Sequence, residues 1–440
     1  MRVTDPTFPI DSLLPDIGAT LHAHTRLVLE APPGAGKTTR VPLALLDAPW
    51  LSGRRIVMLE PRRAAARSAA QFMARQLGED VGATVGYRIR FDNRVSARTR
   101  IEVVTEGILT RMLQDDPLLD GVGALLFDEF HERHLSADLG LALSLDVQSQ
   151  LREDLRIMVM SATLDGERLA RFLDAPRLSS EGRSHAVEVA HLPARREESL
   201  EVQARRAVEH ALARHPGDVL VFLPGQREIA RVGAGLATAA LPAGTEVLAL
   251  HGELPVEQQA RVLQPAADGA RRVVLATNVA ESSVTLPGVR VVIDSGLARE
   301  PRFDPNSGFS RLDVVAIAQA SADQRAGRAG RVASGWAYRL WPESQRLEPQ
   351  RRPEIAMVEL AGLALELAAW GSDQLRFPEP PPPGALAAAR ELLQRLGALS
   401  ATGGVTDTGR RMLAPGTHPR LGAGAGGGGP GRGPGAPAAG

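Results

Sequence analysis

The sequence predicts an α/β protein with two parallel sheets in tandem, and two patterns support this prediction. Short apolar runs alternate with longer segments of helical periodicity, which is typical of strand–helix–strand units that build a parallel sheet. The alternation loosens into a polar stretch near residues 180–200 and then resumes. The chain has 440 residues, and at roughly 150 residues per domain this length gives a prior of about three domains.

The predicted strands are short and rich in valine, isoleucine and leucine. In the first half of the chain they occupy residues 27–31, 55–59, 101–104, 124–127 and 156–160. In the second half they occupy residues 219–223, 247–250, 272–277 and 289–294. Helical patterns such as residues 62–77 lie between them. We therefore place one α/β domain in residues 10–180 and a second in residues 181–350.

The last part of the chain changes character at about residue 353. A helical pattern follows Pro353 and is closed by Gly371, and a second one occupies residues 385–399 after a proline-rich turn. We expect a small helical region in residues 351–420. The final twenty residues, 421–440, contain ten glycines, five alanines and three prolines, a composition that predicts disorder because it cannot bury apolar area.

The composition excludes several classes of protein. Cysteine is absent, which excludes a disulfide scaffold and thiolate chemistry. No apolar run is long enough for a transmembrane helix, and the first residues lack the apolar core of a signal peptide. We therefore expect a cytoplasmic protein. The 51 basic residues balance the 51 acidic ones, so a surface for nucleic acid would have to be a local patch.

A single lysine, Lys37, stands among the 51 basic residues, and all the others are arginines. Arginine carries a planar fork of donors, whereas lysine carries a compact point charge on a flexible stem. A position that keeps lysine in such a sequence is therefore expected to need the point charge, although chance is the alternative explanation for one position.

The segment APPGAGKTT at residues 31–39 follows a predicted strand and opens a predicted helix. This context is typical of a P-loop, in which backbone N–H groups and the helix N-terminus bind phosphate oxygens. Lys37 would reach the β- and γ-phosphates, and the Thr38 hydroxyl would hold Mg²⁺. Ala31 replaces the usual first glycine, while Gly34 and Gly36 are kept. The alternative is an ordinary glycine-rich turn before a helix.

The segment LLFDEFHER at residues 125–133 ends an apolar strand with two carboxylates and a histidine. In a doubly wound sheet such a strand end lies beside the P-loop. Asp128 suits the shell of a Mg²⁺ ion, and Glu129 suits the polarisation of an attacking water. The alternative is an acidic turn with a surface histidine. The position of this segment after a P-loop disfavours that alternative.

The segment ADQRAGRAGR at residues 322–331 brings a glutamine and three arginines into the second α/β domain. Arginines spaced by three residues share one face of a helix. They could neutralise the charge that develops on a γ-phosphate bound to the other domain. The alternative is a solvated basic helix. In so arginine-rich a chain this alternative is substantial for any single arginine, but it is much weaker for a glutamine and three arginines punctuated by glycines.

Taken together, these segments resemble the motifs of the DEAH-box helicases of superfamily 2, and more closely the bacterial HrpB-type helicases. The resemblance covers residues 10–420. The segments that carry it are APPGAGKTT, LEPRRAAARSAA (59–70), VTEGIL (104–109), DEFH (128–131), SAT (161–163), FLPGQREI (222–229), ATNVAESSVTL (276–286) and QRAGRAGR (324–331). The resemblance implies two RecA-like domains with ATP between them, a winged-helix-like region in residues 351–420 and a strand-separating β-hairpin at residues 300–312.

The resemblance also implies roles for individual residues. Those that bind the nucleotide would be Gly34, Ala35, Gly36, Lys37, Thr38 and Thr39. Those that handle Mg²⁺ would be Thr38, Asp128 and Glu129. Those that act in hydrolysis would be Glu129, Gln324, Arg328 and Arg331. Those that line the nucleic-acid backbone would be Arg62, Arg63, Thr105, Gly225, Gln226 and Thr277.

The predicted function is therefore an ATP-dependent helicase that hydrolyses ATP with Mg²⁺ and acts as a monomer. It would act on single-stranded or partly duplex nucleic acid, with RNA favoured over DNA. The family continues well beyond residue 420, into a part that closes the nucleic-acid channel. The alternative is therefore a shortened nucleic-acid-binding fragment that binds ATP but does not unwind.

Overall fold

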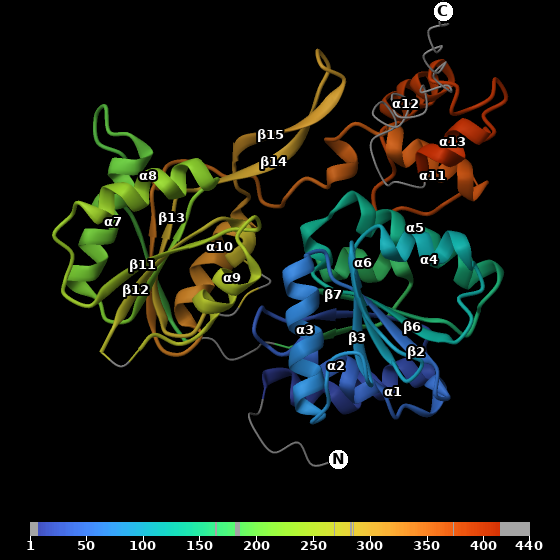
Figure 1. The fold of residues 1–440 in the computed structure, drawn as a ribbon, viewed down its shortest axis with the longest axis horizontal. Helices are drawn as coiled ribbons and strands as arrows, with labels where there is room; N and C mark the ends of the chain where they lie inside the picture. Colours follow the sequence, from blue (N-terminus) through green and yellow to red (C-terminus); the bar gives the residue numbers. More distant parts are fainter. Residues whose placement is uncertain are drawn as a thin grey trace, which may run out of the picture. The chain divides into compact units, whose positions relative to one another are not determined.

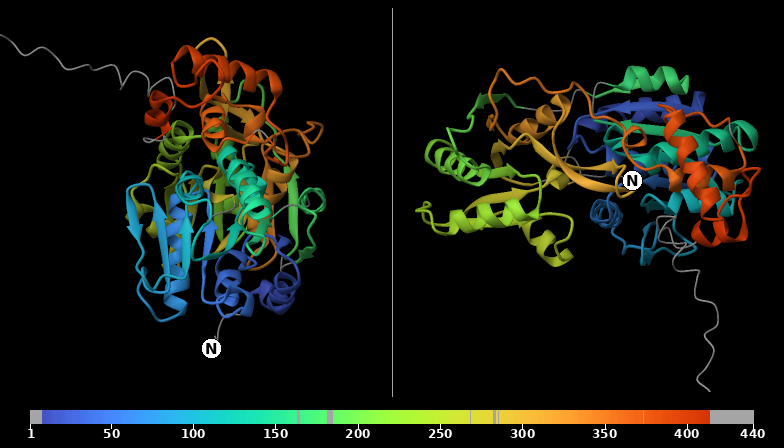
Figure 2. Two further views of the ribbon diagram at one scale, coloured as in Figure 1. Left: turned by 90° about the vertical axis from the view of Figure 1, so that its right-hand side faces the viewer. Right: turned by 90° about the horizontal axis from the view of Figure 1, so that it is seen from above.

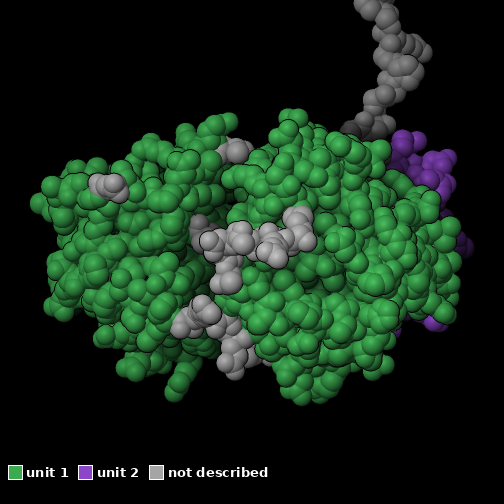
Figure 3. Space-filling view, turned by 90° about the horizontal axis from the view of Figure 1, so that it is seen from below, with its two compact units in different colours: residues 1–301, 311–353 green, residues 302–310, 354–440 purple. Residues whose placement is uncertain are grey.

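The structure is a computed structural model, and it confirms the α/β fold class with two parallel-dominated sheets. It describes residues 8–162, 165–180, 185–267, 269–281, 284, 286–372 and 374–413. The chain divides into two compact units, coloured separately in Figure 3. Residues 1–301 and 311–353 form the first unit, and residues 302–310 and 354–440 form the second. Both large sheets belong to the first unit.

The first sheet has eight strands in the order β4-β3-β5-β2-β6-β7-β1-β8. Its strands are β1 (Arg26–Glu30), β2 (Arg55–Leu59), β3 (Val85–Ile89), β4 (Asp92–Arg94), β5 (Ile101–Val104), β6 (Val122–Phe127), β7 (Arg156–Ser161) and β8 (Arg177–Ser179). Every pairing is parallel except that of β3 with β4. The carboxyl ends of the parallel strands therefore meet at one edge of the sheet.

Helices cover both faces of this sheet (Figures 1 and 2). They are α1 (Leu14–Ala23), α2 (Lys37–Leu45), α3 (Arg63–Gln76), α4 (Ile108–Asp115), α5 (Leu135–Gln150) and α6 (Gly166–Leu173). Leu27 and Leu29 of β1 join one apolar cluster with residues of α1, α2 and α3. Val28, between them, is equally buried but points to the other face. Because helices cover both faces of the sheet, the strands are continuous apolar runs and do not alternate between apolar and polar residues.

The second sheet has six strands in the order β11-β12-β10-β13-β16-β9, and all its pairings are parallel. Its strands are β9 (Val187–His191), β10 (Asp218–Phe222), β11 (Thr245–Leu250), β12 (Arg271–Ala276), β13 (Val289–Asp294) and β16 (Gly335–Arg339). Helices α7 (Leu200–Arg214) and α8 (Gln226–Ala237) pack on one face, and α9 (Val256–Leu263) and α10 (Gln319–Gly327) on the other. The change of sheet falls between β8 and β9, inside the polar stretch of the sequence.

A two-stranded sheet, β14 (Leu297–Asp304) and β15 (Phe309–Ala316), follows β13. The β-hairpin expected at residues 300–312 is therefore present. Its turn is closed by the Asp304 carboxylate, which accepts a hydrogen bond from the Asn306 backbone, and by Gly308, whose φ of 71° favours glycine. A role of this hairpin in strand separation stays a prediction.

The second unit contains α11 (Ala361–Trp370), α12 (Pro383–Arg395) and α13 (Asp407–Leu413), with one antiparallel bridge between Leu399 and Val405. The helix predicted from residue 354 begins only at Ala361, and residues 354–356 form a short 3₁₀ turn. The Glu359 side chain accepts a hydrogen bond from the Ala361 backbone and so starts the helix there. The second predicted helix ends at Arg395 rather than at residue 399, because Gly397 adopts a φ of 68°.

The tail at residues 421–440 lies outside the described residues, so its predicted disorder stays a prediction. Among the helices within the described ranges, none combines the length and apolar character that crossing a bilayer requires.

Arg325 of α10 is a buried cation in the core of the second sheet. Its guanidinium bonds Glu281 (Nε to Oε2, 3.0 Å) and Asp294 (Nη1 to Oδ1, 2.8 Å), and its Cζ lies 4.7 Å from the centre of the Phe222 ring. The side chain is only 1% exposed. Burial lowers the pKa of Arg325, but the two carboxylates outweigh burial and raise it above its ordinary value. Arg325 therefore ties α10 to β10 and β13.

Replacing Arg325 by alanine is expected to lower the free energy of unfolding by about 3–5 kcal/mol, because Asp294 would remain buried without its cation. Arg205→Ala removes a half-exposed arginine of the same unit and should change it by less than about 0.5 kcal/mol. Urea unfolding followed by circular dichroism compares the two midpoints, and equal midpoints would contradict a structural role for Arg325.

Candidate functional site

The P-loop follows β1 and ends where α2 begins at Lys37. Gly34 and Gly36 adopt φ values of 83° and 92°, which strongly favour glycine. A Cβ at Gly36 would also lie 2.8 Å from the side chain of Phe8. Ala31 stands where the first glycine is usual, and its backbone N–H extends the β1–β7 ladder to the Ser161 carbonyl at 3.0 Å. The loop therefore needs glycine at two positions, and these are the two that the sequence keeps.

Lys37 is buried, with its side chain 3% exposed, and its Nζ lies 3.0 Å from Glu129 Oε1. Burial lowers the pKa of Lys37, but the carboxylates of Glu129 and Asp128 outweigh burial and raise it. The ammonium group is therefore held charged at the start of α2.

Asp128 and Glu129 follow β6, at the same sheet edge as the P-loop. Thr38 Oγ1 donates to Asp128 Oδ2 at 2.5 Å, and the Glu129 backbone N–H donates to Asp128 Oδ1 at 2.8 Å. Glu129 has a φ of 50°, an uncommon conformation for a residue with a side chain. Burial raises the pKa of Glu129, but the charge and the hydrogen bond of Lys37 outweigh burial and lower it. Burial raises the pKa of Asp128.

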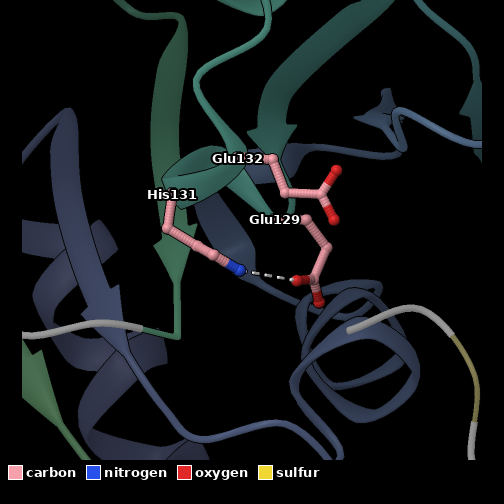
Figure 4. A group of neighbouring side chains, drawn as sticks. All are labelled: Glu129, His131 and Glu132. Atoms are coloured by element: carbon pink, nitrogen blue, oxygen red, sulfur yellow. Dashed lines mark ion pairs between the residues drawn. The ribbon is translucent and has the colours of Figure 1, made fainter. Parts of the chain in front are cut away.

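His131 joins the acidic pair to the end of β7 and to the second sheet. Its Nδ1 accepts a hydrogen bond from the Ala162 backbone N–H at 3.1 Å. Nε2 therefore carries the proton and faces Glu129 Oε2 at 3.3 Å, as Figure 4 shows. The Gln324 Nε2 lies 3.5 Å from the same ring nitrogen. Thr163, the last residue of the SAT segment, lies outside the described residues.

Glu129, His131 and Glu132 present ligand atoms within 4.8 Å of one another, a spacing that could hold a metal ion. Glu132 is already engaged, however, because its carboxylate accepts from Arg62 Nη2 at 3.2 Å and lies 2.7 Å from His134 Nε2. Burial raises the pKa of Glu132, but Arg62 and His134 outweigh it and hold the pKa well below the usual range. Glu132 is therefore an anchor for Arg62 rather than a free metal ligand.

Two arginines that follow α10 lie near the acidic pair, Arg328 buried and Arg331 partly buried. Arg328 donates from Nε to the Glu281 carbonyl at 2.8 Å, while its Nη2 is buried without a hydrogen-bond partner among the described residues. Burial lowers the pKa of Arg328 well below its ordinary value, and the nearby Arg331 lowers it further. Burial also lowers the pKa of Arg331 to about 10. A polyphosphate bound in this region would bring negative charge close to both guanidinium groups.

A cavity of about 1090 Å³ brings residues of both sheets together. The first sheet contributes the whole P-loop from Gly34 to Thr39, together with Glu60, Glu129 and Ala162. The second contributes Gln324, Gly327 and Arg331. A Cβ at Gly34 would lie 3.4 Å from Arg331 Cζ, so the guanidinium packs directly against the loop. Asp128 and Arg328 do not line the cavity, although both adjoin residues that do.

The residues expected to line nucleic acid lie elsewhere, and none of the six lines this cavity. In the first sheet, Arg62 and exposed Arg63 follow β2, and Thr105 follows the neighbouring β5. In the second sheet, Gly225 and Gln226 follow β10, and Thr277 follows the neighbouring β12. Each sheet thus places its set at the carboxyl ends of two adjacent strands.

Comparisons with known proteins agree with these motifs. A family model described as DEAD/DEAH box helicase matches residues 17–172, and one described as helicase conserved C-terminal domain matches residues 203–333. The chain therefore carries a DEAD/DEAH box helicase domain and a helicase conserved C-terminal domain. Each sheet thus carries one of the two helicase domain matches.

The chain is similar to an RNA helicase of Escherichia coli. It is 46% identical over 425 residues to the "ATP-dependent RNA helicase HrpB" of Escherichia coli K12, an alignment that covers 95% of this chain and 52% of that protein. Crystal structures of the E. coli DEAH/RHA helicase HrpB and of the E. coli DExH-box NTPase HrpB superpose with TM-scores of 0.90 and 0.87, each at 45% identity. The two superpositions cover 94% and 96% of this chain, and 54% and 53% of the respective E. coli chains. The chain therefore spans about half the length of these helicases.

Glu60 is a member of this site that the sequence did not lead us to predict. It follows β2 and lines the cavity, and its Oε1 is buried without a hydrogen-bond partner among the described residues. Burial raises the pKa of Glu60 well above its usual range, and the neighbouring carboxylates Asp128 and Glu129 raise it further. The available signal was a carboxylate directly after a buried strand, the same signal that identified Asp128.

The lowered pKa of Glu132 predicts a pH-dependent contribution to stability. Because its folded pKa lies below the unfolded value of about 4.3, this contribution is present above that value and is lost as the pH falls through the folded pKa. Glu132→Gln should therefore lower the free energy of unfolding at pH 7, on the order of 3 kcal/mol. The deficit should shrink below about pH 4.

Urea unfolding at pH 7 and at about pH 3 measures both quantities, with Glu209→Gln as the control, because Glu209 is an exposed glutamate on α7 of the same unit. A deficit of the same size at the two pH values would contradict the assigned pKa shift.

Proposed function

We propose that this chain is an ATPase stimulated by nucleic acid, and that it uses ATP hydrolysis to move along RNA and unwind it. One observation carries the proposal: Gln324 and Arg331 of the second sheet reach the cavity that the P-loop of the first sheet lines. Two sheets that share one nucleotide can open and close with hydrolysis, which is what a motor requires. The name of the E. coli relative, an ATP-dependent RNA helicase, supports RNA as the nucleic acid.

The P-loop would bind the triphosphate. Backbone N–H groups at the start of α2, together with those of Gly34, Ala35 and Gly36, would donate to phosphate oxygens. Lys37 now pairs with Glu129 at 3.0 Å, and arriving phosphates would offer its ammonium a second, stronger set of partners. Thr39, on the first turn of the helix, lines the same cavity.

The oxygen donors beside the P-loop fit a magnesium ion, which prefers hydroxyl and carboxylate oxygens. Thr38 and Asp128 would hold it, since their side chains already meet at 2.5 Å, and Glu129 would adjoin its shell. A bound magnesium ion would neutralise charge on the β- and γ-phosphates.

Four side chains would carry out hydrolysis. Glu129 would accept a proton from the attacking water, because its lowered pKa keeps it ionised. Gln324 would orient that water from the second sheet. Arg331, packed on the P-loop, and Arg328, through an Nη2 that no described residue bonds, would neutralise the charge of the transition state.

The nucleic acid would contact the strand ends away from the cavity. The proposed residues are Arg62, Arg63 and Thr105 in the first sheet, and Gly225, Gln226 and Thr277 in the second. Such contacts to the sugar–phosphate backbone carry no sequence information, which suits a protein that steps along a strand. A cytoplasmic location and a monomeric state remain parts of this proposal.

An ATPase assay with and without single-stranded RNA or DNA tests the proposal, with Lys37→Ala as the inactive control. We expect RNA to stimulate hydrolysis more than DNA does. A strand-displacement assay on a partly duplex RNA then separates unwinding from hydrolysis. Stimulated hydrolysis without displacement would favour the alternative of a fragment that does not unwind, and no stimulation would contradict the motor itself.

Glu129→Gln is expected to bind ATP with nearly unchanged affinity but to lose at least ~10²-fold in turnover, because the amide cannot take up the proton of the water. Anisotropy of a fluorescent ATP analogue measures binding, and phosphate release measures turnover. Normal turnover in this variant would rule out the role assigned to Glu129.

Arg331→Ala should slow hydrolysis by ~10³-fold, since contributions of this size are typical of an arginine that neutralises the transition state. Binding of the fluorescent analogue should fall much less, because the P-loop is intact. Arg346→Ala, which removes an exposed arginine of the same unit, is the matched control. A loss of the same size in both variants would show that Arg331 has no special part in the chemistry.

A further inference from the structure

His251 lies between two groups of residues that the proposed function uses. It follows β11, at the carboxyl edge of the second sheet, where Gln226 follows β10 and Thr277 follows β12. Strand β12 lies between the other two, so all three ends are neighbours. His251 Nδ1 meets Gln226 Nε2 at 3.1 Å. His251, at the end of a third strand, thus contacts a residue of the proposed nucleic-acid surface.

Burial sets the charge of the His251 ring, and the Gln226 contact sets which of its nitrogens carries the proton. Burial lowers the pKa of His251, and the neighbouring Glu253 only partly offsets that effect. The ring is therefore neutral at pH 7, and Nδ1 accepts the hydrogen bond from the Gln226 amide while Nε2 carries the proton. In this arrangement the amide of Gln226 is fixed in one orientation, with its oxygen directed away from His251.

On its other side His251 is connected to the wall of the nucleotide cavity. The Leu254 backbone N–H donates to the His251 carbonyl at 3.2 Å, which closes the turn between β11 and α9. Gln259 of α9 then donates from Nε2 to the Leu254 carbonyl at 2.8 Å. Gln259 lines the nucleotide cavity, and so does Leu250, the residue before His251.

We propose that His251 is a positioning residue that couples the nucleic-acid-binding end of α8 to the nucleotide cavity. It would orient the Gln226 amide for a strand, and its turn would transmit a shift of that amide to Gln259. The inference rests on the proposed function, in which Gln226 contacts nucleic acid. A continuous chain of contacts does not by itself demonstrate coupling, so the test must measure an interaction energy.

The test is a double-mutant cycle of Gln226→Ala, His251→Ala and the double variant. The readouts are the RNA concentration that gives half-maximal stimulation of ATP hydrolysis, and the KM for ATP without RNA. Each single variant should raise the half-maximal RNA concentration about 5- to 10-fold, the loss expected for one hydrogen bond. The double variant should need no higher an RNA concentration for half-maximal stimulation than the single variant with the larger effect. The KM for ATP should stay unchanged.

Two further variants distinguish positioning from packing. His251→Asn can still accept from Gln226 and should restore most of the RNA response, whereas His251→Phe fills the space without an acceptor and should behave like His251→Ala. His22→Ala, which removes an exposed histidine of α1, is the matched control and should behave like the wild type.

The outcomes separate this inference from the proposed function. If RNA fails to stimulate the wild type, the proposed function is contradicted and the inference with it. If RNA stimulates the wild type but the single effects multiply in the double variant, only the coupling through His251 is overturned. The same holds if His251→Phe responds to RNA like the wild type, or if His251→Ala alters the KM for ATP.

Discussion

Buried charges of opposite sign face one another at the edge of the first sheet, and the rest of the site depends on how they balance. Lys37 is satisfied by Glu129 and Asp128, whereas burial lowers the pKa of Arg328 and of Arg331, and the nearby Glu129 acts in the opposite direction on both. A triphosphate would supply further negative charge. Because the cations come from both sheets, binding of the nucleotide would be linked to the position of one sheet relative to the other.

This balance requires a strict geometry, and parallel strands provide it. β1, β2, β6 and β7 are neighbours in register, so the residues that follow them meet at one edge. Hydrogen bonds then fix the groups: Ala162 holds the His131 ring, His131 faces Glu129, and Thr38 holds Asp128. Glu129 in addition occupies a left-handed backbone conformation, a local strain that the surrounding bonds must maintain.

The sequence predicted those parts of the fold and site that depend on local pattern. Buried strands appear as apolar runs, and the P-loop needs glycine at Gly34 and Gly36, so both could be located. The different environments of neighbouring arginines could not be predicted from the sequence. Arg325 is enclosed by two carboxylates, Arg328 bonds carbonyls and Arg331 packs on the P-loop, because each points in a different direction from one short segment. Glu60 and His251 were missed because their partners lie far away in the sequence. The late start of α11 depends on Glu359 accepting from the Ala361 backbone, which the helical pattern does not reveal.

The lone lysine has a practical consequence. Reagents that acylate primary amines find one target side chain in the whole chain, and it is the buried ammonium group of Lys37, 3% exposed and engaged with Glu129. Acylation at that residue therefore reports directly on how often the P-loop opens to solvent. Surface immobilisation or dye labelling through lysines would, by the same reasoning, leave the arginine side chains untouched.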